Sequence, residues 1–591
     1  MTFKTKLTTW LPEIDIAFPG LLIILAALFP FWSSTPAYTG QIILLGAIYA
    51  IALLGLDLIV GYAGALSIGH AALFGVGAYT TGVLTLQAGF PGWLALPISA
   101  ILAGCAGWLM SLPLLKANDK YVALGTLVFG LSASIIFNEW NSITGGSIGL
   151  TLPPQRWAGL QLSTYHYTYL ALILLVLSIK IINTLTQSSL GRAFEAMRDA
   201  PIAAECMGIH VNRHKQGSFV MGGLFAGLAG GLFALSQGYI ASSSFSFEMS
   251  VNFLLALMLG GKKSRLGILL GAAVVIFLPL MLSSIMEWHP IIYGGLILLA
   301  TYVLPGGIVS LLPHKYTSKK TYIAPVSHDQ KAIHLTSHTT IDTSILALDN
   351  VSMRFDAFYA LKNVTLHIKP GTIAGIIGPN GAGKSTLINI LTGIYTQTDG
   401  DISFCDQSTH SWATSKLAQA GIARTFQNLQ IFCGLSVLEN ILVGLHHCHE
   451  NNPLKIATGL HTKKDFTAYE RAWSLLHLVN LHEYAHTLAS ALSYGQKRFL
   501  EIARALACNP KLLLLDEPAA GMRGADLEQL KVLIQSIRRH GIAVLLIEHH
   551  IDIITTLSDH IFAFNFGELI AHGSPEHVIT HHAVKEAYLG S

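Results

Sequence analysis

Charged residues are scarce in this chain, and they are scarcest in its first half. Only 12% of the 591 residues are Asp, Glu, Lys or Arg, about half the share of an ordinary soluble domain. The deficit lies in residues 1–313, whereas residues 314–591 have an ordinary globular composition. A net charge of +3 gives no reason to expect a nucleic-acid partner. The contrast predicts at least two domains, of which the first is membrane-embedded.

The chain also lacks paired cysteines. Its six cysteines show no C-x-x-C spacing, so neither a disulfide framework nor a structural zinc site is indicated. The run at 446–449 reads HHCH, but adjacent residues do not point at one ion, and a solvated loop is the simpler interpretation. A cleavable signal is not apparent either, because the apolar run after Lys4 and Lys6 has no small-residue cleavage site. We therefore expect that run to be a retained membrane span.

Long apolar runs fill the first half. A helix needs ~20 apolar residues to cross a bilayer. Ten candidate spans lie near residues 15–32, 41–60, 65–86, 93–115, 121–138, 166–185, 217–239, 249–261, 266–286 and 291–312. The eighth is short and is compatible with a re-entrant or broken helix. The pattern predicts an all-α polytopic transmembrane domain of about ten helices.

The basic residues of this half indicate its orientation. There are thirteen, namely Lys4, Lys6, Lys116, Lys120, Arg156, Lys180, Arg192, Arg198, Arg213, Lys215, Lys262, Lys263 and Arg265. With the N-terminus in the cytoplasm, ten crossings place all of them except Arg156 in or beside a cytoplasmic segment. Because ten is an even number of crossings, the chain also returns to the cytoplasm at His314. The connection at residues 61–64 carries no charge and is the weak point of this assignment.

The second half has the pattern of a nucleotide-binding domain. Residues 314–344 are rich in Ser, Thr, His and Lys without apolar periodicity, which predicts a flexible linker. In residues 345–591 short apolar strands alternate with helices, as in an α/β core. The predicted domains are thus a transmembrane permease domain at 1–313, the linker, and a nucleotide-binding domain at 345–591.

A phosphate-binding loop opens this second domain. The run GPNGAGKS at 378–385 follows a buried-strand pattern at 373–377 and precedes a helix. In such a loop the backbone amides cradle phosphates, Lys384 bridges the β and γ groups, and Ser385 ligates Mg²⁺. The predicted nucleotide contacts of the loop are Gly378, Asn380, Gly381, Gly383, Lys384, Ser385 and Thr386.

The phosphate loop alone fits many classes of nucleotide hydrolase, and the run LSYGQ at 492–496 selects one of them. It resembles the signature of ABC ATPases. In that family the signature, here with Ser493, Gly495 and Gln496, contacts the γ-phosphate held by the opposite subunit. The resemblance therefore implies a second ATP-binding subunit.

The same resemblance assigns the remaining motor residues. Phe355 is at the position of the aromatic residue that stacks on adenine, and Gln427 is in the loop that touches Mg²⁺ and water and senses the coupling helix. Asp516 should hold Mg²⁺ through water, and Glu517 should polarise the attacking water. His549 matches the switch histidine that contacts the γ-phosphate.

One motor position departs from the ABC pattern. The subunit-crossing loop, at residues 521–523, carries Arg523 where Asn or Asp is expected. That departure bears on communication with the partner site and leaves the ATP-binding residues themselves intact.

Three stretches of the membrane half also resemble a known family. They read GYAGALSIGHAA at 61–72, WNSITGG at 140–146 and AAECMGI at 203–209. Their order and spacing resemble the LivM-type permease subunit of branched-chain amino acid (Leu/Ile/Val) uptake systems, over roughly residues 40–312. The resemblance implies that the loop with Ala203, Ala204, Glu205 and Gly208 is the coupling helix, which docks in a groove on an ATPase.

The sequence departs from these permeases at two places. Asp57 stands where Asn is expected, and residues 262–265 read KKSR where relatives are less charged. An acid within a span is costly and usually faces protein or water. Asp57 therefore either lines the translocation path or forms a hydrogen-bonded packing site near the cytoplasmic end of its span, and the sequence leaves both interpretations open.

The second half resembles the LivG-type ATPases of the same uptake systems. The resemblance covers residues 346–591 and includes GIARTFQN at 421–428 and YLG at 588–590. Together the two halves imply a fused permease–ATPase subunit, multi-pass in the bacterial inner membrane with its ATPase in the cytoplasm. ATP and Mg²⁺ are the implied cofactors. The implied partners are a second permease, a second ATP-binding subunit (fused or separate) and a periplasmic solute-binding protein.

The favoured hypothesis is ATP-driven import of branched-chain or related hydrophobic amino acids. An importer of urea or short amides is the first alternative, because such permeases resemble this one closely. A homodimeric half-exporter is a second, although exporters favour six spans with long cytoplasmic extensions. A membrane-anchored ATPase that only signals is a third, although ten spans are far more than an anchor requires.

Overall fold

The computed structural model describes residues 36–114, 119–154, 156–157, 160–281, 288–311, 344–448 and 463–589, with isolated positions at 20, 23–24, 26–28 and 456. The chain divides into two compact units. The first comprises residues 1–185 and 212–321, and the second comprises residues 186–211 and 322–591. A short segment from the hydrophobic half of the sequence therefore folds with the second unit.

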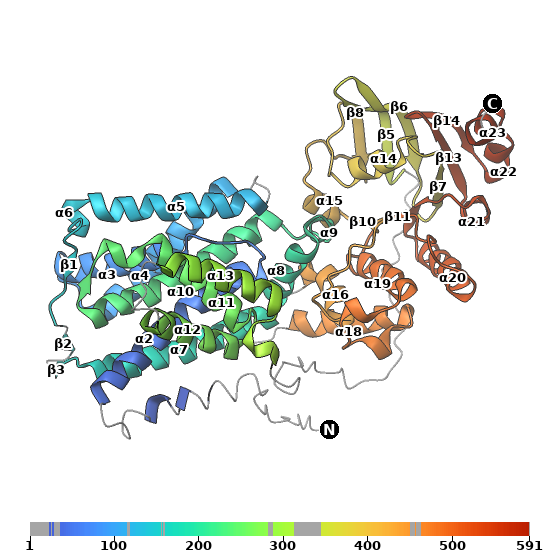
Figure 1. The fold of residues 1–591 in the computed structure, drawn as a ribbon. Coiled ribbons are helices and arrows are strands. Elements are labelled where there is room, and N and C mark those ends of the chain that lie inside the picture. The colour runs from blue at the N-terminus through green and yellow to red at the C-terminus, as the bar shows by residue number, and fades with distance from the viewer. Residues whose placement is uncertain are drawn as a thin grey trace. The chain divides into compact units, whose positions relative to one another are not determined.

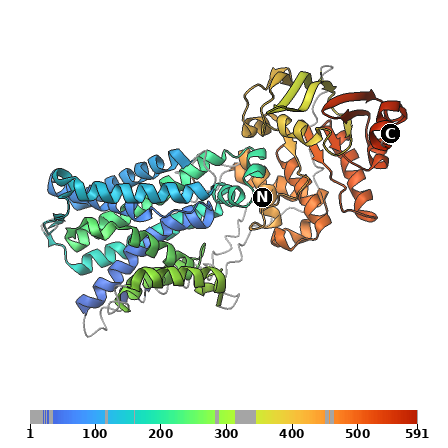
Figure 2. The same ribbon diagram turned by 45° about the horizontal axis from the view of Figure 1, so that its top comes forward.

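The first unit is helical. Its main helices are α2 (Pro36–Asp57), α3 (His70–Leu86), α4 (Gly92–Ser111), α5 (Asp119–Glu139), α7 (Thr164–Gln187), α10 (Val211–Gln237), α11 (Phe247–Gly260), α12 (Arg265–Met281) and α13 (His289–Val303). They overlap the predicted spans from 41–60 onward, with ends that differ by several residues, and lie largely side by side (Figure 1 and Figure 2). Shorter elements are η2 (Leu58–Tyr62), η3 (Leu112–Leu114), α6 (Asn141–Thr144), η4 (Ser242–Phe245), η6 (Ile308–Leu311) and the strand pairs β1 (Leu150–Thr151) with β4 (Tyr239–Ile240) and β2 (Arg156–Trp157) with β3 (Leu160–Gln161).

Five described stretches are long and apolar enough to cross a membrane. They are Tyr38–Tyr62, Gly92–Ser111, Tyr121–Glu139, Thr164–Gln187 and Val211–Gln237. The apolar helices α11 and α12 are shorter. The first predicted span, 15–32, lies outside the described residues apart from a few isolated positions, so the count of ten crossings stays a prediction.

Glycine and phenylalanine explain how these helices approach one another. A Cβ on Gly77 of α3 would collide with the backbone of Gly227 in α10, and one on Gly230 would collide with the carbonyl of Phe74. The ring of Phe74 lies 5.5 Å from that of Phe233 and 5.8 Å from that of Phe253, measured between centroids. The glycines are therefore close-packing positions, and the aromatic rings fill the space between the backbones.

The second unit contains two sheets. Its six-stranded sheet has the order β10-β11-β12-β7-β13-β14, in which only the last strand is antiparallel. The four-stranded antiparallel sheet has the order β6-β5-β8-β9. The strands are β5 (Leu346–Phe355), β6 (Phe358–Ile368), β7 (Ile373–Ile377), β8 (Asp399–Phe404), β9 (Gln407–Ser408), β10 (Ile422–Arg424), β11 (Leu512–Asp516), β12 (Ala543–Ile547), β13 (His560–Asn565) and β14 (Glu568–Gly573).

Helices cover the larger sheet. They are α14 (Lys384–Leu391), α15 (Thr414–Ala420), α16 (Val437–Gly444), α18 (Lys463–Leu478), α19 (Tyr494–Ala507), α20 (Ala525–Arg539), α21 (Ile551–Leu557), α22 (Pro575–Thr580) and α23 (His582–Leu589), with 3₁₀ turns η8 (His446–Cys448), η9 (His482–Tyr484) and η10 (Ala489–Ala491). The segment from the hydrophobic half adds α8 (Ser189–Asp199) and α9 (Pro201–Cys206).

The central strands are buried on both faces. Leu513 and Leu515 of β11 pack with the helices α16, α18 and α19, whereas Leu512 and Leu514 pack with α14 and the four-stranded sheet. Successive residues of a strand face opposite sides, and parallel sheets covered on both sides read as continuous apolar runs. The predicted fold class, a helical membrane domain followed by an α/β ATPase domain, is confirmed. The predicted linker at 314–344 lies almost wholly outside the described residues.

Candidate functional site

Four neighbouring parallel strands bring the predicted catalytic residues to one edge of the sheet. β7 leads into Gly378, β11 ends at Asp516 and is followed by Glu517, and His549 follows two residues after β12. Gln427 follows β10. Because ligands bind outside the carboxyl ends of parallel strands, this edge is the candidate site.

The phosphate loop connects β7 to α14. Gly381 and Gly383 have φ angles of 83° and 98°, a region that side-chain-bearing residues rarely adopt. The Lys384 Nζ donates to the carbonyls of Gly378, at 2.6 Å, and Pro379, at 2.9 Å. Burial lowers the pKa of Lys384, while Glu517 and Asp516 oppose the shift. Its ammonium and the first amides of α14 form a cationic end suited to an anion.

The other predicted contacts of this loop lie along its open side. Asn380 and Ser385 are exposed, and Thr386 is partly exposed. Ser385 and Thr386 belong to the first turn of α14, where their hydroxyls accompany the helix amides. The loop therefore presents hydroxyl groups and backbone amides together, as binding of a phosphate chain requires.

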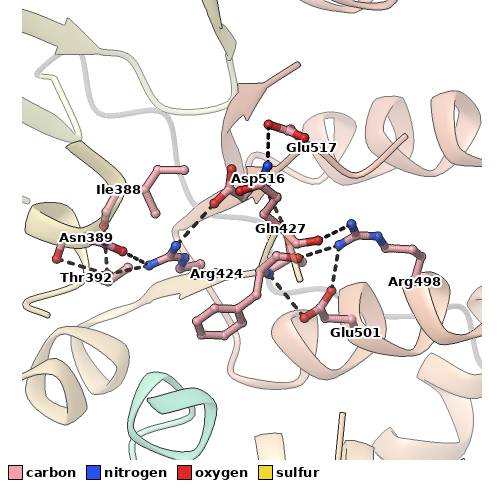
Figure 3. A network of polar contacts seen from close by, with 11 residues as sticks. Ile388, Asn389, Thr392, Arg424, Gln427, Arg498, Glu501, Asp516 and Glu517 are labelled. Carbon is pink, nitrogen blue, oxygen red and sulfur yellow. Dashed lines mark hydrogen bonds and ion pairs between the residues drawn. The ribbon is translucent and has the colours of Figure 1, made fainter. Parts of the chain in front are cut away.

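Glu517 joins the two other predicted catalytic residues. Its Oε1 accepts a hydrogen bond from Gln427 Nε2 at 3.0 Å and lies 2.9 Å from His549 Nε2. Its φ angle is 48°, a conformation uncommon for a residue with a side chain. Figure 3 shows Gln427 directed toward the carboxylate of Glu517. The structure thus brings Gln427, Glu517 and His549 into one cluster.

Asp516 has a buried cationic partner that the sequence did not identify. Arg424 NH2 lies 3.3 Å from Asp516 Oδ2, and Arg424 NH1 donates to Asn389 Oδ1 at 2.6 Å (Figure 3). Burial raises the pKa of Asp516, and the guanidinium of Arg424 opposes that shift. Arg424 therefore ties the phosphate-loop helix α14 to the end of β11. The sequence feature that could have revealed this contact is the arginine within the otherwise apolar strand β10.

The chemistry of these residues fits a hard divalent cation. Ser385, Gln427 and Asp516 offer a hydroxyl, an amide and a carboxylate, and Mg²⁺ prefers oxygen ligands. Asp516 is 3% exposed and lies directly at the end of its strand. The residues present are thus compatible with the predicted metal.

Phe355 lies apart from this cluster, at the end of β5. Its side chain is 41% exposed and meets Tyr395 edge to face, with ring centroids 5.4 Å apart. An exposed ring supported by a second aromatic residue is suited to stacking against a flat base.

The signature residues form the start of α19. Ser493 caps the helix: its Oγ accepts from the Gln496 amide at 3.3 Å, and Gln496 Oε1 accepts from the Ser493 amide at 3.0 Å. A Cβ on Gly495 would lie 2.8 Å from Asp526 Oδ2. Within the described part of the chain, neither Ser493 nor Gln496 bonds to the phosphate loop. The structure therefore does not bring the signature into the Glu517 cluster.

The predicted coupling loop packs against the ATPase inside the second unit. α9 contacts α15, and α8 contacts α16 (Figure 1). Ala203 and Ala204 are fully buried, and the carbonyl of Gly208 accepts from Gln419 Nε2 at 3.3 Å. Gly208 has a φ angle of 81°, and a Cβ there would collide with His447 Nε2. Glu205 is partly buried.

Three further contacts of this segment were not predicted. The carboxylate of Asp199 accepts from the Gly434 amide at 2.8 Å, and His210 Nδ1 lies 2.7 Å from Ser415 Oγ. Met207 Sδ lies 3.3 Å from Cys508 Sγ, just after α19. The segment therefore contacts the ATPase through polar bonds as well as apolar packing.

Arg523 lies in an exposed turn after Glu517. Gly521 and Gly524 on either side have φ angles of 76° and 57°, so the turn is built on glycines. Nothing in the structure explains why Arg occupies this position.

Asp57, in the first unit, is buried and paired. Its Oδ2 lies 3.5 Å from Arg265 NH1, and its Oδ1 accepts from the Lys263 amide at 2.9 Å. Arg265 also donates to Asn183 Oδ1 at 2.6 Å and to the Tyr62 hydroxyl at 3.4 Å. These contacts favour the interpretation of Asp57 as a packing site.

Comparison with known proteins identifies both halves. Residues 38–301 match the family described as "Branched-chain amino acid transport system / permease component", and residues 361–520 match the ABC transporter family. The ATP-binding protein BraF of Pseudomonas aeruginosa is 39% identical over 249 residues, covering 42% of this chain and 98% of that protein. The permease protein LivM of Escherichia coli is 33% identical over 315 residues, covering 49% of this chain and 74% of that protein.

A third relative, the Escherichia coli ATP-binding protein LivG, is 38% identical over 256 residues, covering 42% of this chain and 98% of that protein. All three relatives are named as components of high-affinity branched-chain amino acid transport. The resemblance found in the sequence is confirmed, and so is ATP hydrolysis coupled to transport as the activity of the class. The chain belongs to the branched-chain amino acid transport family of ABC transporters, with a permease component and an ATP-binding component in one polypeptide.

Proposed function

We propose that this chain is a fused permease–ATPase subunit that imports branched-chain or related hydrophobic amino acids, driven by ATP hydrolysis. The observation that carries the proposal is the packing of residues 186–211 with the ATPase. Met207, Gly208 and His210 from the permease half contact Cys508, Gln419 and Ser415 of the motor. A permease loop seated on a motor is what transfer of motion between them requires.

In the motor, each residue of the Glu517 cluster has a chemical task. Glu517 is placed to accept a proton from water attacking the γ-phosphate, and Gln427 and His549 hold its carboxylate from two sides. Lys384 and the amides of α14 bind the phosphates, and Phe355 stacks on the adenine. Mg²⁺ held by Ser385, Gln427 and Asp516 would neutralise charge on the phosphate oxygens.

One chain supplies one phosphate loop and one signature. The exposed capping turn at Ser493 and Gln496 supports a site completed by a second ATP-binding subunit. We propose that a second permease, a second ATPase and a periplasmic solute-binding protein complete the assembly. The importer would lie in the bacterial inner membrane with its ATPase in the cytoplasm, as the distribution of Lys and Arg supports. Proteins that co-purify with the tagged chain identify these partners directly.

Uptake into cells tests the substrate. Cells carrying the full complex should accumulate labelled leucine, isoleucine or valine, and excess unlabelled leucine should compete. Cells carrying Glu517→Gln should express the complex at the same level and accumulate none. Strong uptake of urea without uptake of leucine would assign the chain to the alternative amide substrates. Transport by the purified chain without any binding protein would instead indicate a half-exporter.

A further inference from the structure

Three charged side chains of α19 hold the loop that carries Gln427. Arg498, Glu501 and Arg504 are each 1% exposed, although they carry charge. Glu501 lies between the two guanidiniums, with Oε2 3.3 Å from Arg498 NH1 and Oε1 3.8 Å from Arg504 NH2. Figure 3 shows Arg498 and Glu501 directed from α19 toward the loop that carries Gln427.

The loop itself has no regular structure to satisfy its backbone. β10 ends at Arg424 and the next helix begins at Val437. Buried amides and carbonyls in such a segment need partners from elsewhere in the fold. Without them the position of the Gln427 side chain would not be defined.

Glu501 and its neighbours supply those partners on both sides of Gln427. Glu501 Oε1 accepts from the amides of Phe426, at 3.3 Å, and Gln430, at 3.4 Å. Arg498 donates to the carbonyls of Phe426, at 2.5 Å, and Gln427, at 2.6 Å. One carboxylate therefore bonds to the residue before Gln427 and to the residue three positions after it.

Arg504 holds the middle of the loop. Its NH2 donates to the Gln430 carbonyl at 2.7 Å, and its guanidinium carbon lies 4.4 Å above the Phe432 ring. The loop is thus attached to α19 near its beginning, at Phe426 and Gln427, and in its middle, at Gln430 and Phe432.

A buried carboxylate is a costly way to attach a loop. Burial raises the pKa of Glu501, while Arg504, Arg498 and the two amides oppose the shift. Apolar residues of similar volume are often equally stabilising in place of a buried ion pair. What they cannot do is accept two amide hydrogen bonds at fixed positions, so the carboxylate provides geometry that packing cannot.

We propose that Glu501 is a positioning residue for ATP hydrolysis, acting through Gln427. It fixes the backbone from which Gln427 Nε2 reaches Glu517 Oε1 at 3.0 Å. The helix α19 begins with the signature, and the residue after its last turn, Cys508, contacts Met207 of the coupling segment. Glu501 therefore lies on the helix that connects the signature to the coupling segment. The inference rests on the proposed roles of Gln427 and Glu517.

The test compares Glu501→Gln with Gln427→Ala, singly and together, in the full complex. Glu501→Gln keeps the size of the side chain and loses the charge that holds Arg498 and Arg504. We expect kcat for ATP to fall about tenfold with KM for ATP changed less than about twofold, because the phosphate loop is untouched. In the Gln427→Ala background the same substitution should add almost nothing, because residues that act as a unit are non-additive.

Two further variants keep the test decisive. Arg498→Lys retains a cation beside Glu501 but loses the fork that reaches two carbonyls, so kcat should fall in the same way. This variant replaces Glu501→Gln in the test if Glu501→Gln does not fold. Glu568→Gln is the matched control, because Glu568 forms an exposed ion pair with Lys362, at 2.7 Å, on the same domain. It should leave kcat and KM unchanged.

The outcomes separate this inference from the proposed function. Equal effects of Glu501→Gln with and without the Gln427 side chain would overturn the positioning role. A fall in melting temperature with unchanged kcat would do so too. If Gln427→Ala itself hydrolyses ATP at the normal rate, the assignment of Gln427 fails, and the inference fails with it.

Discussion

Asp57 and Arg265 form a buried ion pair between two segments that are 208 positions apart in the chain. Their side chains are 0% and 5% exposed. Asp57 ends α2, and Arg265 begins α12. The resemblance to LivM-type permeases leads us to expect Asn at position 57 and fewer charges in the run 262–265, which contains Arg265. The acid at position 57 and a base of that run meet in one contact.

Breaking this pair on one side should destabilise the membrane domain. Asp57→Asn removes the carboxylate that lies 3.5 Å from the buried guanidinium of Arg265, and removal of one partner of a buried pair costs about 3–5 kcal/mol. The melting temperature of the detergent-solubilised full chain should fall. Asp57→Asn combined with Arg265→Met should recover most of the loss. If Asp57 lined the path instead, Asp57→Asn would reduce uptake at an unchanged melting temperature.

Gly208 should control docking of the coupling segment. Its φ angle is 81°, and a Cβ there would collide with His447 Nε2, so the imidazole of His447 would have to shift. We expect Gly208→Ala to abolish amino acid uptake while ATP hydrolysis continues, because the segment no longer seats on the motor. The left-handed conformation alone costs a non-glycine residue about 1–2 kcal/mol.

A matched pair of variants separates the clash from the backbone strain. Gly89 has a φ angle of 66° with nothing within 4 Å of an added Cβ, so Gly89→Ala carries similar strain without a collision. It should leave uptake nearly normal. Gly208→Ala with His447→Ala should regain part of the lost uptake. Loss of uptake in Gly89→Ala equal to that in Gly208→Ala would contradict the docking explanation.

Cys206 should report on the same docking through its reactivity. Burial raises its pKa to about 12. At pH 8 the thiolate fraction is then roughly one in ten thousand, and the thiolate is the reactive form. N-ethylmaleimide should modify exposed Cys433 at least about 100-fold faster than Cys206, as measured by mass spectrometry of peptides. Undocking by Gly208→Ala should accelerate modification of Cys206, and equal rates in the unchanged protein would contradict the buried position.

Arg424 should set the Mg²⁺ requirement of the motor. Arg424→Gln keeps a polar side chain but removes the cation that lies 3.3 Å from the Asp516 carboxylate. We expect the Mg²⁺ concentration for half-maximal ATP hydrolysis to rise about tenfold, since partners of ligating carboxylates are worth roughly 10–100-fold in metal affinity. Unchanged Mg²⁺ dependence would remove Arg424 from the metal site.

The motifs that the sequence revealed are those in which chemistry follows directly from adjacent residues. Gly378 to Thr386 form a contiguous loop and first helical turn, and Asp516 ends a buried strand that Glu517 directly follows. Such strings fix local backbone geometry, so the residues could be assigned without the fold. The placement of Gln427 and His549 beside Glu517 then follows from strand order, which places the ends of neighbouring parallel strands together.

The residues that the sequence did not reveal act through long-range contacts. Arg424 meets Asp516 across 92 positions, and Asp199 meets the Gly434 amide across 235. Glu501 looks like an ordinary helix residue until the fold places it against Gln427. Each of these contacts depends on how separate elements pack, and nothing in the local sequence specifies its partner.

Hydropathy located the helices but not all of their ends. The helix within the predicted span 65–86 begins only at His70, because residues 63–69 are irregular and follow a π-helical turn at Leu58–Tyr62. These residues are as apolar as the helices around them, so composition alone does not distinguish them. The turn depends on Gly61, where a Cβ would collide with the carboxylate of Asp57.

The central claim is that one polypeptide couples its motor to import of an amino acid. The most direct measurement records leucine uptake and phosphate release together, in proteoliposomes holding the full complex with ATP on the motor side and loaded binding protein on the other. We predict ATP-dependent leucine accumulation that stops, together with phosphate release, in Glu517→Gln while ATP still binds. Phosphate release that continues in Glu517→Gln, or release without leucine accumulation in the unchanged complex, would contradict the account.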